Sequence, residues 1–88
     1  MRIAIIGAVL ENPVQTQKQF NAIISTYKGI VRGRMGIPFD QEDIGVVAVT
    51  IAAEIDEINA LTGKLGSIPG VSVKTAVSKE IERTSSDV

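Results

Sequence analysis

The stretch RIAIIGAVL, residues 2–10, decides the fold, because it is apolar at nearly every position and rich in β-branched residues. A strand that is apolar on both faces is normally a central strand of a sheet. The same pattern returns in IGVVAVTIAA, residues 44–53. We therefore expect these two segments to form the centre of a sheet, with the other elements arranged around them.

Helical spacing of apolar residues predicts a helix after each central strand. The first helix starts at Asn12-Pro13, where Asn12 is expected to act as the N-cap and Pro13 suits the first helical position, and it stops at Gly29. The second helix covers residues 54–65, and we expect Gly66 to end it in a left-handed turn. Each helix leads on to an outer strand.

The outer strands are residues 30–37 and residues 71–78, which show the alternation of half-buried strands. The resulting order is βαββαβ, that of a ferredoxin-like α+β sandwich in which two helices cover one face of a four-stranded antiparallel sheet. We expect residues 1–79 to form this single domain and residues 80–88 to form a flexible C-terminal tail.

Two helices on one face leave the other face of the central strands in water. We expect Ile6 and Ala48 to be among the apolar residues on this open face. An exposed apolar patch usually marks an interface, and a chain of 88 residues gains further burial most simply by binding a second copy. The sequence therefore predicts a homodimer or homotetramer that assembles through the sheet.

The composition excludes several classes of function. The sequence has no cysteine and no histidine, so it lacks thiolate nucleophiles, the usual general base near neutral pH and the usual transition-metal ligands. A net charge of -1 and an aromatic content of 3% argue against autonomous nucleic-acid binding. No apolar run is long enough to span a membrane. We expect a cytoplasmic protein that is not an enzyme and has no cofactor or metal. The acidic residues at positions 40–43 are expected to form an ordinary charged hairpin turn and not a metal site.

Arg32 and Arg34 form the most unusual polar feature of the sequence. Their spacing of i and i+2 puts both side chains on the same face of a strand, which we expect to be the face that the helices leave open. Two guanidinium groups there would grip a carboxylate or a phosphate in bidentate fashion. The alternatives are an ion pair between subunits and a solvated edge strand.

A second candidate site is the segment Glu11-Asn12-Pro13, which joins the first central strand to a helix N-terminus. Backbone N–H groups at such a terminus point outward and favour anions. If a small anionic metabolite binds to the protein, this segment is a place where it would bind, and simple helix capping is the other interpretation.

Two longer motifs resemble a known family: GRMGIP at residues 33–38 and ALTGKLGSIPGVSVKT at residues 60–75. They are similar to those of the iron-only hydrogenase system regulators, small ACT-like domains that resemble the C-terminal domain of the nickel-responsive repressor. The resemblance covers residues 2–79 and implies an oligomeric, ligand-sensing or regulatory ACT-like domain. Ordinary ACT domains bind amino acids near the first strand–helix loop, so the resemblance also points to Glu11-Asn12-Pro13.

The sequence departs from the nickel-responsive repressor in two respects. It has no histidine or cysteine to bind nickel, and it leaves no residues for a separate DNA-binding arm. We therefore expect a non-enzymatic transcriptional regulator of an iron-only hydrogenase system that oligomerises through its sheet and binds an amino acid or a small anionic metabolite at the interface. The alternative is a structural or protein-interaction module that binds a hydrogenase-maturation or redox-enzyme partner.

Overall fold

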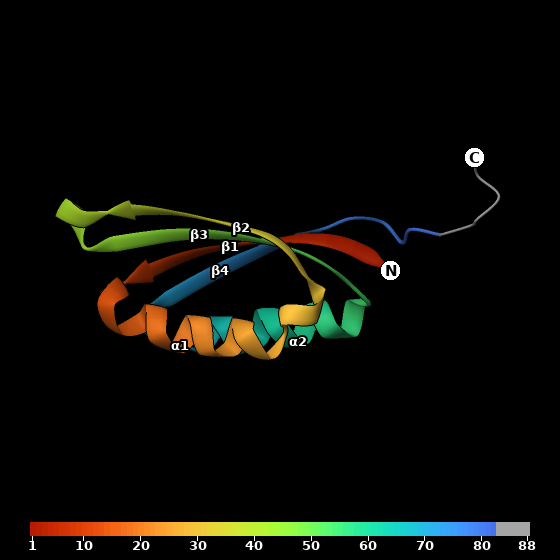
Figure 1. The fold of residues 1–88 in the computed structure, drawn as a ribbon, viewed down its shortest axis with the longest axis horizontal. Helices are drawn as coiled ribbons and strands as arrows, with labels where there is room; N and C mark the ends of the chain where they lie inside the picture. Colours follow the sequence, from red (N-terminus) through yellow and green to blue (C-terminus); the bar gives the residue numbers. More distant parts are fainter. Residues whose placement is uncertain (83–88) are drawn as a thin grey trace.

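A computed structural model describes residues 1–82 of the chain and shows a four-stranded sheet above two helices (Figure 1). The main elements are β1 (Arg2–Glu11), α1 (Pro13–Thr26), β2 (Val31–Phe39), β3 (Ile44–Ala53), α2 (Ile55–Gly66) and β4 (Val71–Val77). Two short 3-10 turns, η1 (Lys28–Ile30) and η2 (Asp40–Glu42), flank β2. All strand pairs are antiparallel in the order β2-β3-β1-β4. This arrangement confirms the ferredoxin-like prediction.

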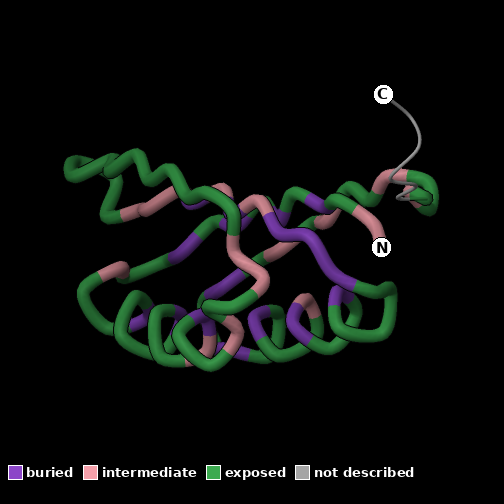
Figure 2. The backbone as a smooth tube through the Cα atoms, turned by 45° about the vertical axis from the view of Figure 1, so that its right-hand side comes forward, coloured by how far each residue is buried: buried purple, intermediate pink, exposed green. Residues whose placement is uncertain are grey.

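The core lies between the sheet and the helices, where every second residue of β1 is buried: Ala4, Ile6, Ala8 and Leu10. Figure 2 shows the purple, buried positions gathered there. The prediction that Ile6 faces the open side was wrong, because its side chain is 0% exposed. Ala48 does lie on the open face, since its partner on β1 is Gly7, the residue after Ile6.

The open face of the sheet is apolar, as the sequence predicted. Its large exposed side chains come from β1 and β2: Ile3, Ile5, Val9, Met35, Ile37 and Phe39. Their exposed fractions range from 41% for Ile3 to 61% for Met35. Both helices lie on the other side of the sheet (Figure 1), so within residues 1–82 no helix covers these side chains.

The ends of both helices differ from their predicted form. Asn12 is the N-cap of α1, but its backbone is left-handed (φ 49°) and its side chain makes no capping hydrogen bond. α1 ends at Thr26, before Gly29, which lies in η1. Gly66 is the last residue of α2 and does not adopt a left-handed conformation, whereas Gly70 does (φ 86°). Gly66 instead allows close packing, because an added Cβ would lie 3.1 Å from Val73 Cγ2.

Glu80 and Ile81 of the predicted tail contact the N-terminus, and residues 83–88 are outside the described part of the chain. The Met1 amino group donates a hydrogen bond to the Glu80 carboxylate, and the Ile81 N–H donates to the Met1 carbonyl. The hydrogen bond to Glu80 raises the pKa of the amino group, and the same bond lowers the pKa of Glu80. Among residues 1–82, no helix is long and apolar enough to cross a membrane.

Candidate functional site

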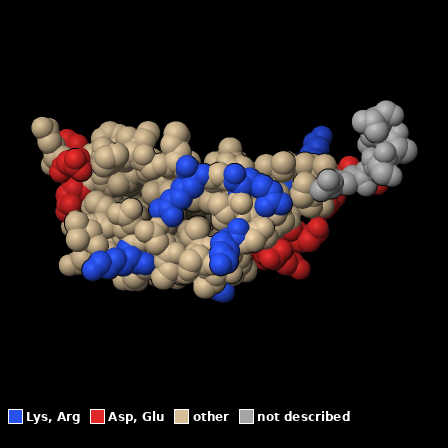
Figure 3. Space-filling model, viewed as in Figure 1, with Lys and Arg blue, Asp and Glu red and all other residues tan. Residues whose placement is uncertain are grey.

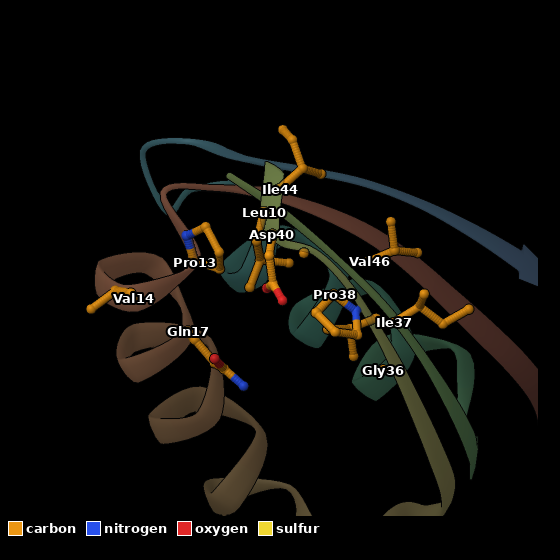
Figure 4. A pocket seen from close by; sticks show the side chains of 12 residues that line it. Leu10, Pro13, Val14, Gln17, Gly36, Ile37, Pro38, Asp40, Ile44 and Val46 are labelled. Atoms are coloured by element: carbon orange, nitrogen blue, oxygen red, sulfur yellow. The ribbon is translucent and has the colours of Figure 1, made fainter. Parts of the chain in front are cut away.

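The β2–β3 hairpin projects beyond the start of α1 (Figure 1). A cleft of about 390 Å³ lies between the helix and the underside of the hairpin (Figure 4). Most of its lining is apolar, from Leu10, Pro13, Val14, Pro38, Ile44 and Val47. The polar side chains in the lining are Gln17 and Asp40. An apolar cleft with a few polar groups is the usual form of a small-molecule site.

Two glycines help to keep the cleft open. Gly36 and Gly45 both line it, and Gly45 faces Pro13 so closely that an added Cβ would lie 3.4 Å from the Pro13 Cβ. A larger residue at Gly45 would therefore fill the inner wall between strand and helix. The sequence alone does not predict this cleft, because its residues come together only through the register of β2 against β3.

The segment Glu11-Asn12-Pro13 lies at one end of this cleft, and Pro13 contributes to its lining. The backbone donors there are mostly engaged or absent. Asn12 N–H donates to the Asp43 carbonyl at 3.2 Å, the N–H groups of Gln15 and Thr16 donate to the Asn12 carbonyl at 2.9 and 3.1 Å, and proline has no N–H. Few free backbone N–H groups therefore remain at this helix terminus to bind an anion, although the sequence predicts an open terminus.

Thr16 fixes the junction between β1 and α1. Its side chain is buried, and its hydroxyl lies 2.9 Å from the Glu11 carbonyl and 3.3 Å from the Asn12 carbonyl, to which it can donate. Glu11 N–H in turn donates to the Gly70 carbonyl at 2.8 Å. These hydrogen bonds within the chain fix the conformation of the strand–helix loop, which forms the inner end of the cleft.

Arg34 lies on the helix side of the sheet, so the prediction that Arg32 and Arg34 share the open face was wrong. Arg34 pairs with Val49, which is fully buried against the helices. Its guanidinium donates to Asn21 Oδ1 on α1 at 2.6 Å and lies 5.6 Å from the centre of the Phe20 ring. Both contacts tie β2 to α1.

A bulge in β2 separates the two arginines. Val31 pairs with Ile51 and Gly33 with Thr50, so Arg32 is the extra residue between two successive partners on β3. Its guanidinium donates to the Gly29 carbonyl at 3.4 Å. The simple i, i+2 alternation therefore does not hold across this part of the strand, and the two guanidinium groups make separate contacts.

The first prediction concerns the binding of transition metals. Within residues 1–82, no group of three or more His, Cys, Asp or Glu side chains is placed to hold a metal ion. With no histidine or cysteine in the sequence, the available ligands are oxygen atoms, which suit Mg²⁺ or Ca²⁺ better than Ni²⁺ or Zn²⁺. Calorimetry of tag-free protein is expected to show no stoichiometric binding of nickel or zinc. A submicromolar affinity for either ion would contradict this.

Residues 2–75 match the TM1266-like family, whose members are described provisionally as iron-only hydrogenase system regulators. Among solved structures, the chain is similar to the uncharacterized protein TM1266 from Thermotoga maritima, with 30% identity and a TM-score of 0.84 over 90% of this chain and 100% of that one. No curated protein matches the sequence.

Two further structures share the fold at low identity. The C-terminal domain of the MgtC protein from Mycobacterium tuberculosis has 14% identity and a TM-score of 0.65, over 96% of this chain and 95% of that one. SnoaB, a cofactor-independent oxygenase from Streptomyces nogalater, has 6% identity and a TM-score of 0.57, over 93% of this chain and 95% of that one. At these identities the likeness shows the fold alone.

Proposed function

Because the chain belongs to the TM1266-like family of iron-only hydrogenase system regulators, we propose that it is a non-enzymatic, ACT-like regulatory domain that self-associates through the open face of its sheet and binds a small metabolite in the cleft beside α1. The observation that carries the proposal is the apolar open face. In such a regulator, ligand binding in the cleft would act by changing the oligomer that the domain forms.

Self-association is supported by the side chains that the fold leaves uncovered. Ile5 is 50% exposed and Met35 is 61% exposed, and they lie on the same face of the sheet. Apolar residues scattered singly over a surface need no partner, but a contiguous apolar surface across three strands is typical of an interface. A second copy offers the same surface in return, as an isologous twofold contact requires. A mass equal to that of the single chain at micromolar concentration would contradict self-association.

The chemistry of the cleft narrows the class of ligand. Asp40 supplies the charged side chain of its lining and Gln17 supplies an amide, while the remaining wall is apolar. A ligand with an apolar body and a hydrogen-bond donor or an amino group would match this lining better than a simple anion. An amino acid could satisfy it through its ammonium group, whereas phosphate would face the carboxylate of Asp40.

A protein partner is the alternative occupant of the open face. The same apolar side chains would suit a maturation or redox-enzyme partner, and an effect on transcription would then pass through that partner. The two functions differ in one measurement, because self-association is seen with the purified chain and partner binding is not. The mass of the purified protein therefore separates them.

Ligand binding in the cleft is tested by thermal unfolding in the presence of individual amino acids, amines and nucleotides. A ligand at 100 times its Kd would stabilise the folded state by about 2.7 kcal/mol, which corresponds to roughly 10 °C or more in a domain of this size. Gln17→Ala is expected to reduce the shift, because it removes the amide from the cleft. Gln19→Ala, on the same helix but outside the lining, should keep it. Equal shifts in the two variants would place the ligand elsewhere.

A further inference from the structure

Two side chains of opposite charge lie at opposite ends of the cleft. Asp40 belongs to its lining and follows β2 at the hairpin end, where the Asn12 N–H donates to the Asp43 carbonyl and holds the turn beside the start of α1. Arg34 lies on the helix side of β2, two residues before Gly36, which also lines the cleft. Figure 3 shows red side chains at the hairpin end and blue ones across the middle of the molecule.

The contact of Arg34 with α1 locates its guanidinium relative to the cleft. Gln17 lines the cleft, and Asn21, whose Oδ1 accepts a hydrogen bond from Arg34 at 2.6 Å, is one helical turn further along α1. Residues four apart are neighbours on one face of a helix. The guanidinium therefore lies at the end of the cleft that is away from the hairpin turn.

Both charged groups can accept a further partner. Arginine has five N–H donors, and Asn21 occupies only one nitrogen of Arg34. Within residues 1–82, no carboxylate is in ion-pair contact with Arg34 and no cation is in ion-pair contact with Asp40. The hydrogen bond to Asn21 and the Phe20 ring, 5.6 Å away, hold the guanidinium in place before a ligand binds.

The distance between the two charges sets the length of a ligand that could reach both. Pro13 lies beside the turn that carries Asp40, and Asn21 lies beside the guanidinium of Arg34. These two residues of α1 are about 12 Å apart along the helix axis, at a rise of about 1.5 Å per residue. A charge-assisted contact takes up about 2.8 Å at each end, which leaves about 6 Å between the charges of the ligand.

We propose that the cleft binds an apolar dipeptide, with its ammonium group at Asp40 and its carboxylate at Arg34. An extended chain advances about 3.3–3.6 Å per residue, so a dipeptide spans the gap, whereas a single amino acid is too short and a tripeptide is too long. The inference rests on the proposed function, because it names the ligand of the same cleft.

Gln17 lies between the two charges and matches the middle of a dipeptide. Its carboxamide has an N–H donor and a C=O acceptor, the same pair of groups that a peptide bond presents. Figure 4 shows the side chains of Gln17 and Asp40 directed into the space between α1 and the hairpin. The walls around them are apolar, from Val14, Pro38 and Val47, and would pack against the side chains of the ligand.

The pair of opposite charges disfavours other classes of ligand. A phosphate bound at Arg34 would leave Asp40 unpaired, and a simple amine bound at Asp40 would leave Arg34 unpaired. A free amino acid carries both charges but holds them too close together to reach both side chains. A dipeptide satisfies both ends and the central amide at once.

The test is a calorimetric titration of the purified protein with Leu-Leu and its end-blocked forms. Leu-Leu is expected to bind. Acetylation of its ammonium group or amidation of its carboxylate should each raise Kd by about 10- to 100-fold, the range for a lost charge-assisted hydrogen bond. Leucine should bind at least about 10-fold more weakly than Leu-Leu, because it reaches one charge only. The same holds for 6-aminohexanoate, which has a similar charge separation but no peptide group and no side chains.

Two variants assign the ends of the ligand. Asp40→Asn should raise the Kd of Leu-Leu and abolish the effect of acetylation, because the ammonium group then has no partner to lose. Arg34→Gln should raise the Kd and abolish the effect of amidation, while acetylation keeps its effect. Asp43→Asn, in the same hairpin, and Arg32→Gln, on the same strand, lie outside the lining and should bind Leu-Leu like the wild type. Circular dichroism checks that each variant is folded.

The outcomes separate the dipeptide from the cleft itself. If leucine, an amine or 6-aminohexanoate binds as tightly as Leu-Leu, the cleft stands as a ligand site and the dipeptide is overturned. If Asp40→Asn and Arg34→Gln both keep the wild-type Kd, or if end-blocking has the same effect in every variant, the assignment of the two ends is overturned. If no amino acid, amine or peptide binds, ligand binding in the cleft fails together with this inference.

Discussion

Ile5→Glu is expected to halve the mass of the assembly and leave the fold intact, whereas Ile6→Glu, one residue further along, is expected to unfold the protein. Ile5 is 50% exposed on the open face, and Ile6 is 0% exposed in the core. The same substitution therefore places a carboxylate at an intersubunit surface in one variant and among buried apolar side chains in the other.

The magnitudes differ because the two positions differ in burial. A glutamate at position 6 removes a buried isoleucine and adds an unpaired buried charge, at a cost on the order of 5 kcal/mol or more, against a total stability of ~5–15 kcal/mol for a domain. A glutamate at position 5 costs the isolated fold about 1 kcal/mol, the span of strand propensities. In an apolar interface, however, it buries a charge in each subunit.

Circular dichroism and sedimentation equilibrium together decide the outcome. A folded Ile5→Glu protein of reduced mass supports the open-face contact. Thr50→Glu, on β3, extends the test to a second strand of the same face. If Ile5→Glu keeps the full mass, the open face is not the interface, and if Ile6→Glu folds normally, the assignment of the core is wrong.

The pattern of the sequence predicts the order and pairing of the elements well but not which face the helices cover. β1 is apolar at both sets of alternate positions, with Ile3, Ile5 and Val9 on one side and Ala4, Ile6, Ala8 and Leu10 on the other. Alternation alone cannot distinguish them. The helices cover the set that includes Ile6, as the loop at Glu11-Asn12-Pro13 directs the chain to that side of the sheet.

The site was harder to predict than the fold, because its residues come together through strand register. Met35 and Ile37 lie on the open face, so Arg34 lies on the helix side with Gly36 and Pro38. The bulge at Arg32 has no clear signal in the sequence. The cleft depends on how far the β2–β3 hairpin projects beyond α1, which is a property of the pairing and not of any one motif.

Gly70→Ala is expected to destabilise the fold by about 1–2 kcal/mol, while Gly63→Ala is expected to stabilise it by about 0.5–1 kcal/mol. Gly70 has a φ of 86°, which a residue with a Cβ adopts at a cost, and its added Cβ would lie 3.2 Å from Thr16 Cγ2. Gly63 lies on the exposed side of α2, and an added Cβ there meets nothing within 4 Å. Alanine at that position gains the higher helix propensity.

Gly70→Ala is also expected to alter the candidate site. The Gly70 carbonyl accepts a hydrogen bond from the Glu11 N–H, and the added methyl group would press on Thr16. Both residues hold the loop at the inner end of the cleft. Thermal unfolding of the two variants should differ in sign, by roughly 4–8 °C for each kcal/mol. Ligand-induced stabilisation should fall in Gly70→Ala and persist in Gly63→Ala. Equal stability of the two variants would show that the left-handed turn at Gly70 is not what fixes the β1–α1 loop.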